Sequence, residues 1–185
     1  NFCTVDLSAF YFDIRKDALY CDSKDTERRK GCIIVLNIIL ESLIKWFAPI
    51  LSFTTEEIFT LISKDNKSIH LEEFIEFPKS FENEQLNQKW IKLKKIRDIC
   101  NISIEAKRAS KEIGSSLETN LIISLNKNLI ELIKNIDMAE LCITSTAELI
   151  ETTSNETTAQ TKKAEGEKCA VCWKITKNGC ARHSN

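Results

Sequence analysis

The sequence of 185 residues contains little glycine and proline, with four Gly and two Pro. Because both residues are frequent in folds made of many short strands and turns, their scarcity favours long uninterrupted helices. The sequence also lacks a long unbroken apolar run, since the longest, CIIVLNIILESLIKWFAPIL, contains Asn37, Glu41 and Lys45. A membrane-spanning helix needs about 20 mostly apolar residues. We therefore expect a core helix in this segment and no membrane as a partner.

No charge of one sign dominates the sequence. Its 26 Lys and Arg oppose 27 Asp and Glu, so the net charge of -1 indicates no class of partner. A secretion signal is also missing, because Asp6 and Asp13 interrupt the opening apolar stretch. We therefore expect a cytoplasmic protein with reduced cysteines. Residue 1 is Asn and not Met, from which we expect a fragment of a longer protein.

Three segments in residues 1–63 have apolar residues at helical spacing. They cover 2–20, then a largely buried segment at 31–47 that ends before Pro49, then a helix that begins in SFTTEEIF. In the third segment, Thr54 as N-cap and Glu57 predict a capping box, with Phe53 and Ile58 as a hydrophobic staple. We expect these helices to share one apolar core. The bundle would cover residues 1–83, be truncated at its N-terminus and end in an irregular segment at 64–83.

A long helix is predicted from Glu84 to about Ile113, where Gly114 would provide a left-handed C-cap. One face of this helix is a mainly basic stripe of Lys94, Arg97, Asn101, Ile104, Arg108 and Lys111. The opposite face is apolar and carries Ile91, Ile99, Ile102, Ala106 and Ala109. A charge run on a helix is usually its solvated face, and a phosphate-binding surface is the alternative interpretation.

Two short apolar segments, NLIISL and ELCITSTAEL, are strand candidates with an amphipathic helix near 127–136 between them. Together with the long helix they predict a small α/β unit over residues 84–150. The next segment, ETTSNETTAQTKKAEG, has no large apolar residue and predicts a flexible linker over 151–166. The predicted fold class is therefore mainly α, with a helical bundle, a small α/β unit and a tail module at 167–185.

The tail module gathers Cys169, Cys172, Cys180 and His183, which form two ligand pairs separated by seven residues. Three thiolates and one imidazole satisfy the tetrahedral preference of Zn²⁺ and leave no open position, so the zinc would be structural. The module is too short to bury a core, and the metal would supply its folding free energy. Unliganded or disulfide-bonded cysteines and a redox pair are the alternatives; a redox pair needs a CxxC at the start of a helix.

The tail also carries Lys174, Lys177 and Arg182, with Trp173 directly after a ligand cysteine. An exposed aromatic ring on a basic knuckle would stack on an unpaired RNA base. The same ring would alternatively cap the small core of the zinc module. The sequence shows no Ser/His/Asp set, no cleft with paired acids and no Gly-rich phosphate loop, so we expect no active site in this chain.

Four segments resemble, in this order, the C-terminal region of bacterial-type isoleucyl-tRNA synthetases: NFCTVDLSAFYFDIRKDALYC, WFAPILSFTTEEIF, IRDICNISIEAKRASKEIGSSLE and AEGEKCAVCW. The resemblance covers nearly the whole chain. It implies the helical anticodon-binding domain of class Ia synthetases, a small α/β junction region and a zinc tail that grips the anticodon loop. The opening and the PILSFTTEE block are shared in kind with the valyl enzyme, so a valyl-type fragment is an alternative that the zinc tail disfavours.

The resemblance also implies what the full enzyme does: it would activate isoleucine with ATP and esterify it to tRNA(Ile), and it would be monomeric. The catalytic and editing domains lie outside this chain. The expected tRNA contacts are Lys94, Arg97, Arg108 and Lys111 on the helix and Trp173, Lys174, Lys177 and Arg182 on the tail. In the common family pattern the fourth metal ligand is a cysteine, where this chain has His183. A zinc-stabilised protein-interaction module without RNA binding remains the alternative from another functional class.

Overall fold

The computed structural model describes residues 1–63 and 67–183, and the chain forms two compact units. One unit contains Asn1–Cys21 with Asn83–Asn185, and the other contains Asp22–Glu82. The predicted bundle over 1–83 is thus divided, because the first helix packs with the C-terminal part of the chain. Residues 64–66 of the predicted irregular segment and 184–185 of the predicted tail lie outside the described residues.

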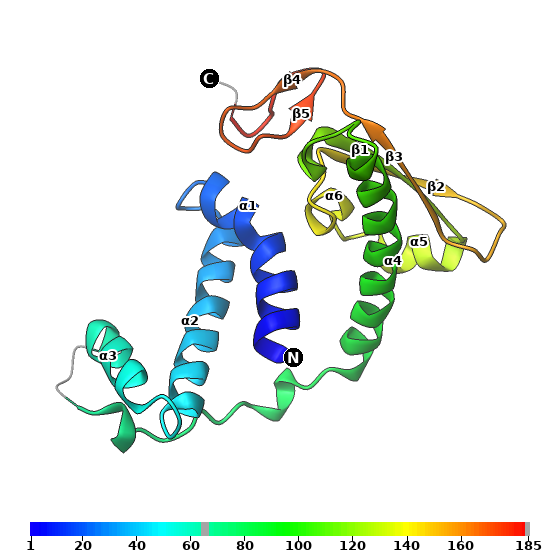
Figure 1. The fold of residues 1–185 in the computed structure, drawn as a ribbon. Coiled ribbons are helices and arrows are strands. Elements are labelled where there is room, and N and C mark those ends of the chain that lie inside the picture. Colours follow the sequence, from blue (N-terminus) through cyan, green and yellow to red (C-terminus); the bar gives the residue numbers. More distant parts are fainter. Residues whose placement is uncertain (64–66, 184–185) are drawn as a thin grey trace. The chain divides into compact units, whose positions relative to one another are not determined.

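The unit of residues 22–82 consists of α2 (Glu27–Phe47), α3 (Ser52–Ile62) and the 3-10 turns η2 (Ile69–Leu71) and η3 (Lys79–Phe81) (Figure 1). Its core is small, with Ile44, Ala48 and Ile69 buried and Ile58 and Phe59 packed against them. The prediction that the second helix is largely buried is wrong. Apolar residues occur all around α2, whereas α3 and η2 cover part of it and leave Ile34 59% exposed.

The start of α3 differs from the predicted capping box. The helix begins at Ser52, so Thr54 lies within its first turn, and Phe53 is 93% exposed and forms no staple. Glu56 provides a different link, because its carboxylate accepts a hydrogen bond of 2.9 Å from the backbone N–H of Ile69. This contact ties α3 to η2.

The second unit begins with the helix predicted over 2–20, whose first part has π-helical geometry. Its elements are η1 (Phe2–Phe12), α1 (Asp13–Cys21), α4 (Glu84–Ala109), the 3-10 turn η4 (Ser116–Glu118), β1 (Thr119–Leu125), α5 (Lys127–Ile133), α6 (Met138–Leu141), β2 (Thr146–Glu151), β3 (Thr158–Lys163), β4 (Glu167–Lys168) and β5 (Ile175–Thr176). The predicted fold class, mainly α with a small α/β unit and a C-terminal Cys/His module, is confirmed.

The boundaries of α4 are set by residues on either side of it. At its start the Asn83 side chain accepts a hydrogen bond of 2.9 Å from the backbone N–H of Leu86. The helix ends at Ala109, and Lys111, not Gly114, takes the left-handed conformation, with a φ of 60°. The predicted glycine C-cap is therefore wrong.

The buried face of α4 also differs from the predicted one. It consists of Leu93, Ile96, Cys100 and Ile104, at helical spacing. Ile104 had been placed on the basic stripe, and Ile102, placed on the apolar face, is 72% exposed. A 26-residue helix with apolar residues on several sides offers more than one candidate face, and the sheet that covers it selects among them.

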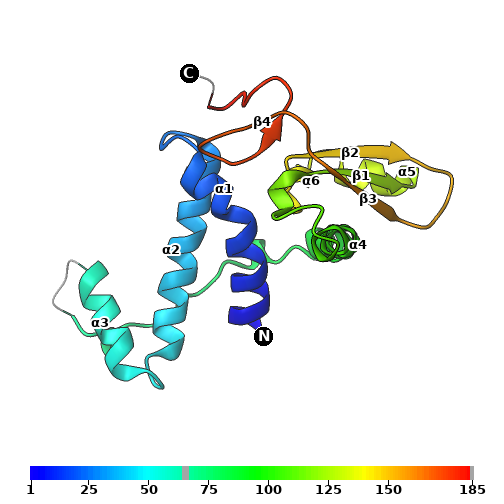
Figure 2. The same ribbon diagram turned by 45° about the horizontal axis from the view of Figure 1, so that its top comes forward.

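The sheet of this unit has the strand order β2-β1-β3, with β1 parallel to β2 and antiparallel to β3. Leu121, Ile123 and Leu125 of β1 are fully buried, and α4 packs along β3 and β1 (Figure 2). The hydroxyls of Ser103 on α4 and Thr161 on β3 lie 2.7 Å apart. The first predicted strand is present as β1, whereas the second, predicted over 140–149, becomes a strand only from Thr146, because α6 occupies its start. The flexible linker predicted over 151–166 contains strand β3. The residues of β3 are small or polar and add no large apolar side chain to the core. Their backbone groups form the hydrogen bonds of the ladder with β1.

Within the described part of the chain, each helix is too short or too polar to cross a membrane.

Candidate metal centre

The tail after β3 folds into a knuckle, which we define as residues 167–183. The hairpin of β4 and β5 carries Cys169 just after its first strand, and two backbone hydrogen bonds close the turn: Cys169 N–H to Lys174 O at 2.9 Å and Trp173 N–H to Cys169 O at 3.0 Å. Gly166 precedes the hairpin with a φ of +127°. A Cβ atom there would lie 2.3 Å from the carbonyl oxygen of Thr176, so the close approach of the two strands requires glycine.

The knuckle brings the four predicted ligands together, with their donor atoms all within 4.8 Å of one another. The Sγ atoms of Cys172 and Cys180 are 3.7 Å apart, and His183 Nδ1 lies 3.5 Å from Cys169 Sγ and 3.2 Å from Cys180 Sγ. Zinc bonds measure about 2.3 Å to sulfur and 2.0–2.1 Å to nitrogen. In a tetrahedron with these bonds, two sulfurs lie about 3.8 Å apart, and a sulfur and a nitrogen lie about 3.6 Å apart. The donor set and its spacing therefore fit one tetrahedral ion.

Backbone amides of the knuckle favour the thiolate form of one ligand. Hydrogen bonds from the backbone at Cys172 and Val171 lower the pKa of the Cys169 thiol to about 6. Burial raises the pKa of Cys172. A hydrogen bond to the carbonyl of Cys21 raises the pKa of His183. A thiolate at Cys169 near neutral pH suits a metal ligand, because only the deprotonated sulfur binds metal.

Two of the predicted tRNA contacts on α4 make contacts inside the unit. Lys94 forms an ion pair of 2.9 Å with Asp6 and lies 4.8 Å from the centre of the Phe10 ring. Arg97 donates to the backbone carbonyl of Leu141 at 2.9 Å and also lies over Phe10. Both residues therefore hold α4 against its neighbours, and the stripe is not a uniformly solvated basic face.

The remaining predicted contacts are more accessible. On α4 and just after it, Arg108 is exposed and pairs with Glu105, and Lys111 is exposed. On the knuckle, Trp173 is 59% exposed and Lys177 pairs with an acidic side chain that is itself largely exposed. The structure thus separates residues with a packing role from residues that face solvent.

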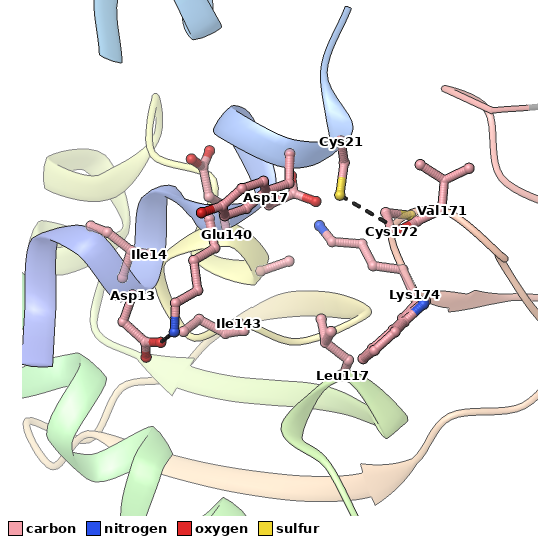
Figure 3. Close-up of a pocket in the computed structure, with 14 residues that line it drawn as sticks. Asp13, Ile14, Asp17, Cys21, Leu117, Glu140, Ile143, Val171, Cys172 and Lys174 are labelled. Carbon is pink, nitrogen blue, oxygen red and sulfur yellow. Dashed lines mark hydrogen bonds and ion pairs between the residues drawn. The ribbon is translucent and has the colours of Figure 1, made fainter. Parts of the chain in front are cut away.

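Residues of α1 that the sequence did not single out also contribute to this region. His183 Nε2 lies 2.8 Å from the carbonyl oxygen of Cys21, and Arg182 donates two hydrogen bonds of 2.8 Å to the carboxylate of Asp17. A cavity of about 330 Å³, lined by mostly apolar side chains such as Ile143, lies between α1, α6 and the knuckle (Figure 3). No sequence pattern marks these partners, because they are separated from the knuckle by more than 160 residues.

Comparisons with known proteins agree with the resemblance found in the sequence. A family profile described as "Anticodon-binding domain of tRNA ligase" matches residues 1–123. The chain is 71% identical to the isoleucine–tRNA ligase of Pelagibacter ubique (strain HTCC1062) over 100% of this chain and 20% of that protein. It is 37% identical to the isoleucine–tRNA ligase of Agrobacterium fabrum over 95% of this chain and 19% of that protein.

The isoleucine–tRNA ligase of Mesorhizobium japonicum is 44% identical over 78% of this chain and 15% of that protein. The chain thus spans about a fifth or less of the length of these relatives. The profile covers 123 of 185 residues, which include the whole unit of residues 22–82 and part of the other unit. On this match, the chain belongs to the family of anticodon-binding domains of tRNA ligases.

Proposed function

We propose that the chain is the tRNA-recognition part of an isoleucine–tRNA ligase and that its knuckle binds the anticodon loop of tRNA(Ile). The full enzyme would use ATP to join isoleucine to this tRNA, as a monomer in the cytoplasm, with its catalytic and editing domains outside this chain. The family match and the identity of 71% over the whole chain to one such ligase support the proposal.

Trp173 is the observation that carries the RNA-binding part of this proposal. Its φ is 63°, a conformation that costs L-residues about 1–2 kcal/mol and that glycine adopts freely. Its ring is 59% exposed, with the Lys168 ammonium 5.3 Å from the ring centre. A large aromatic side chain held at a strained and exposed position, next to Lys174, suits stacking on an unpaired base beside phosphates.

The proposed phosphate contacts follow from exposure. The exposed side chains of Arg108, Lys111 and Lys177 would contact the RNA backbone, together with the half-buried Lys174 on the knuckle. Lys94 donates a hydrogen bond to Asp6, and Arg97 donates one to the Leu141 carbonyl. We therefore propose that these two residues hold α4 in place and do not contact the RNA directly. Phosphate contacts raise affinity for all RNA and weaken with salt, whereas base contacts discriminate between sequences.

We further propose that the four donors of the knuckle bind one Zn²⁺. When bound, the ion would supply structural cross-linking of the tail and no catalytic step, because Cys169, Cys172, Cys180 and His183 fill a tetrahedron. Elemental analysis should give one zinc per chain, with the three ligand thiols resistant to alkylation until a chelator is added. A chain purified with zinc available that contains none and has freely reactive knuckle thiols would contradict this assignment.

Binding of anticodon stem-loops tests the RNA proposal. The chain should bind the stem-loop of an isoleucine tRNA more tightly than one with an altered anticodon. Trp173→Ala should weaken binding of the isoleucine stem-loop by about 1–3 kcal/mol if one base stacks on the ring, whereas Lys111→Ala should weaken both complexes equally and reduce their salt dependence. Equal binding of the two stem-loops by the unmodified chain would reject the proposal. Absence of any RNA binding would favour a protein-interaction module.

A further inference from the structure

The C-terminal end of α1 and the knuckle are joined by paired polar contacts. Asp17 and Cys21 are four residues apart and therefore lie on one face of α1. The carboxylate of Asp17 accepts both hydrogen bonds from Arg182, and the Cys21 carbonyl lies 2.8 Å from His183 Nε2. The Cys21 thiol adds a weaker contact of 3.7 Å to the carbonyl of Val171 (Figure 3). We call this set the α1–knuckle contact.

The contact determines which nitrogen of His183 carries a proton. A carbonyl oxygen only accepts hydrogen bonds, so Nε2 must be the donor to Cys21. In the neutral ring Nδ1 then presents its lone pair, and Nδ1 is also the atom that lies 3.2 Å and 3.5 Å from the two sulfurs. The two nitrogens therefore face two different partners, the metal donors on one side and α1 on the other.

The end of α1 is a suitable acceptor for such a donor. Cys21 is the last residue of α1, and the last four carbonyls of a helix have no partner within the helix. The partial negative charge at a helix C-terminus also favours a nearby cation, and Arg182 provides one beside Asp17. In the α1–knuckle contact, Arg182 and His183 thus donate hydrogen bonds to the Asp17 carboxylate and the Cys21 carbonyl, which would otherwise bind water.

We propose that His183 is a positioning residue that couples metal binding in the knuckle to docking of the knuckle on α1. The inference depends on the zinc proposed above. With Nδ1 on the metal, the ring retains its proton only at Nε2, which fixes the tautomer that donates to Cys21 and strengthens this hydrogen bond. Without metal, the ring is free to exchange with the tautomer that has its proton on Nδ1, and this tautomer has no donor toward Cys21. A cysteine at position 183 would supply a ligand sulfur and no donor toward α1.

Nitrogen NMR of the full 185-residue chain tests the tautomer directly, with His70 as a reference. Loaded with cadmium-113, the chain should show coupling of the metal to His183 Nδ1 and a slowly exchanging proton on Nε2. His70, the second histidine and exposed on η2, should show neither. Coupling to Nε2 instead of Nδ1 would overturn the inference.

Hydrogen exchange tests the docking. In the zinc-loaded chain, the backbone amides of the last turn of α1 should be protected, and His183→Cys should reduce this protection by roughly tenfold while zinc stays at one per chain. Asp17→Asn should act in the same direction with all four ligands intact. Asp13→Asn is the matched control, because Asp13 lies on the same helix and pairs with Lys16 instead of the knuckle; it should leave protection unchanged.

The outcomes separate this inference from the proposed metal site. One zinc per chain with undiminished protection in both His183→Cys and Asp17→Asn overturns the coupling and leaves the metal site intact. A chain that binds no zinc overturns both. Loss of protection in both variants, with zinc retained and Asp13→Asn unaffected, supports the coupling.

Discussion

At the scale of single residues, Trp173 combines two properties that seldom occur together in a side chain of its size. It adopts a left-handed backbone conformation, and more than half of its surface is exposed. The sequence suggested two roles for it, stacking on RNA or covering the small core of the metal module. Replacing Trp173 by glycine, which favours this backbone conformation, distinguishes the role in RNA stacking from the role in covering the metal module.

Trp173→Gly should therefore leave zinc affinity unchanged or raise it, because glycine removes a backbone cost of about 1–2 kcal/mol at this position. Affinity for the isoleucine stem-loop should fall at the same time. Competition with a chromophoric chelator measures the zinc affinity, and Trp173→Phe, which keeps a ring and the strained backbone, is the control. A clear loss of zinc affinity in Trp173→Gly would mean that the ring covers the metal module.

The sequence identified clusters of residues correctly where the members lie close together along the chain. Cys169, Cys172, Cys180 and His183 were identified from spacing alone and lie together in the structure. The roles of Lys94, Arg97 and Arg182 were not accessible in this way. Their partners are Asp6, the Leu141 carbonyl and Asp17, which lie far away in the sequence and become neighbours only through the fold.

At the scale of elements, the corrected face of α4 has a measurable consequence. Ile104→Ala should lower the free energy of unfolding of its unit by about 2–5 kcal/mol, because Ile104 is 2% exposed within the core. Ile102→Ala should change it by less than about 0.5 kcal/mol, since Ile102 is largely exposed. Hydrogen exchange of the β1 amides reports this free energy. The opposite order of the two effects would restore the face predicted from sequence.

The glycines at two element boundaries should respond differently to substitution. Gly166→Ala should destabilise the β4–β5 hairpin by about 1–3 kcal/mol or more, since its φ of +127° suits glycine and the added Cβ would meet the Thr176 carbonyl. Gly114→Ala should be tolerated, because its Cβ would meet only the Glu118 carboxylate at 3.7 Å. Chelator competition measures the first effect and thermal unfolding the second. Equal effects would contradict the assigned boundaries.

The elements themselves were predicted where the pattern of one segment sufficed. The strand at Thr119–Leu125 and the helix that follows it have clear periodicity. Strand β3 was missed because TAQTKK has no large apolar residue, and its partner β1 supplies the backbone pairing that makes it a strand. The start of α3 was misplaced because the residue before it, Leu51, makes no side-chain capping hydrogen bond, so no capping signature in the sequence marks this start.

At the scale of the whole chain, the two units differ in the size of their cores. Among the described residues, the core cluster of the unit of residues 22–82 contains three buried apolar side chains, whereas that of the other unit contains thirteen. Apolar burial supplies most of the folding free energy, so the smaller core predicts a much less stable unit. The unit of residues 22–82 also exposes large apolar side chains such as Phe53 and Leu61.

Hydrogen exchange should therefore show amides of α2 and α3 opening at least about 100-fold more often than those of β1. The difference should persist when zinc is removed, because none of the buried residues in the larger core cluster belongs to the knuckle. Equal protection of α2 and β1 would show that the chain unfolds as one cooperative body and would contradict the division into units.

The strand β3 has one more consequence, which concerns how far the knuckle can travel. Residues 164–166 alone separate β3 from β4, and even a flexible connection of three residues would reach only about 10 Å on average. A flexible tether of the 16 residues from 151 to 166 would reach about 22 Å on average. Because the accessible volume scales with the cube of this length, the short connection raises the effective concentration of the knuckle near α1 by about tenfold.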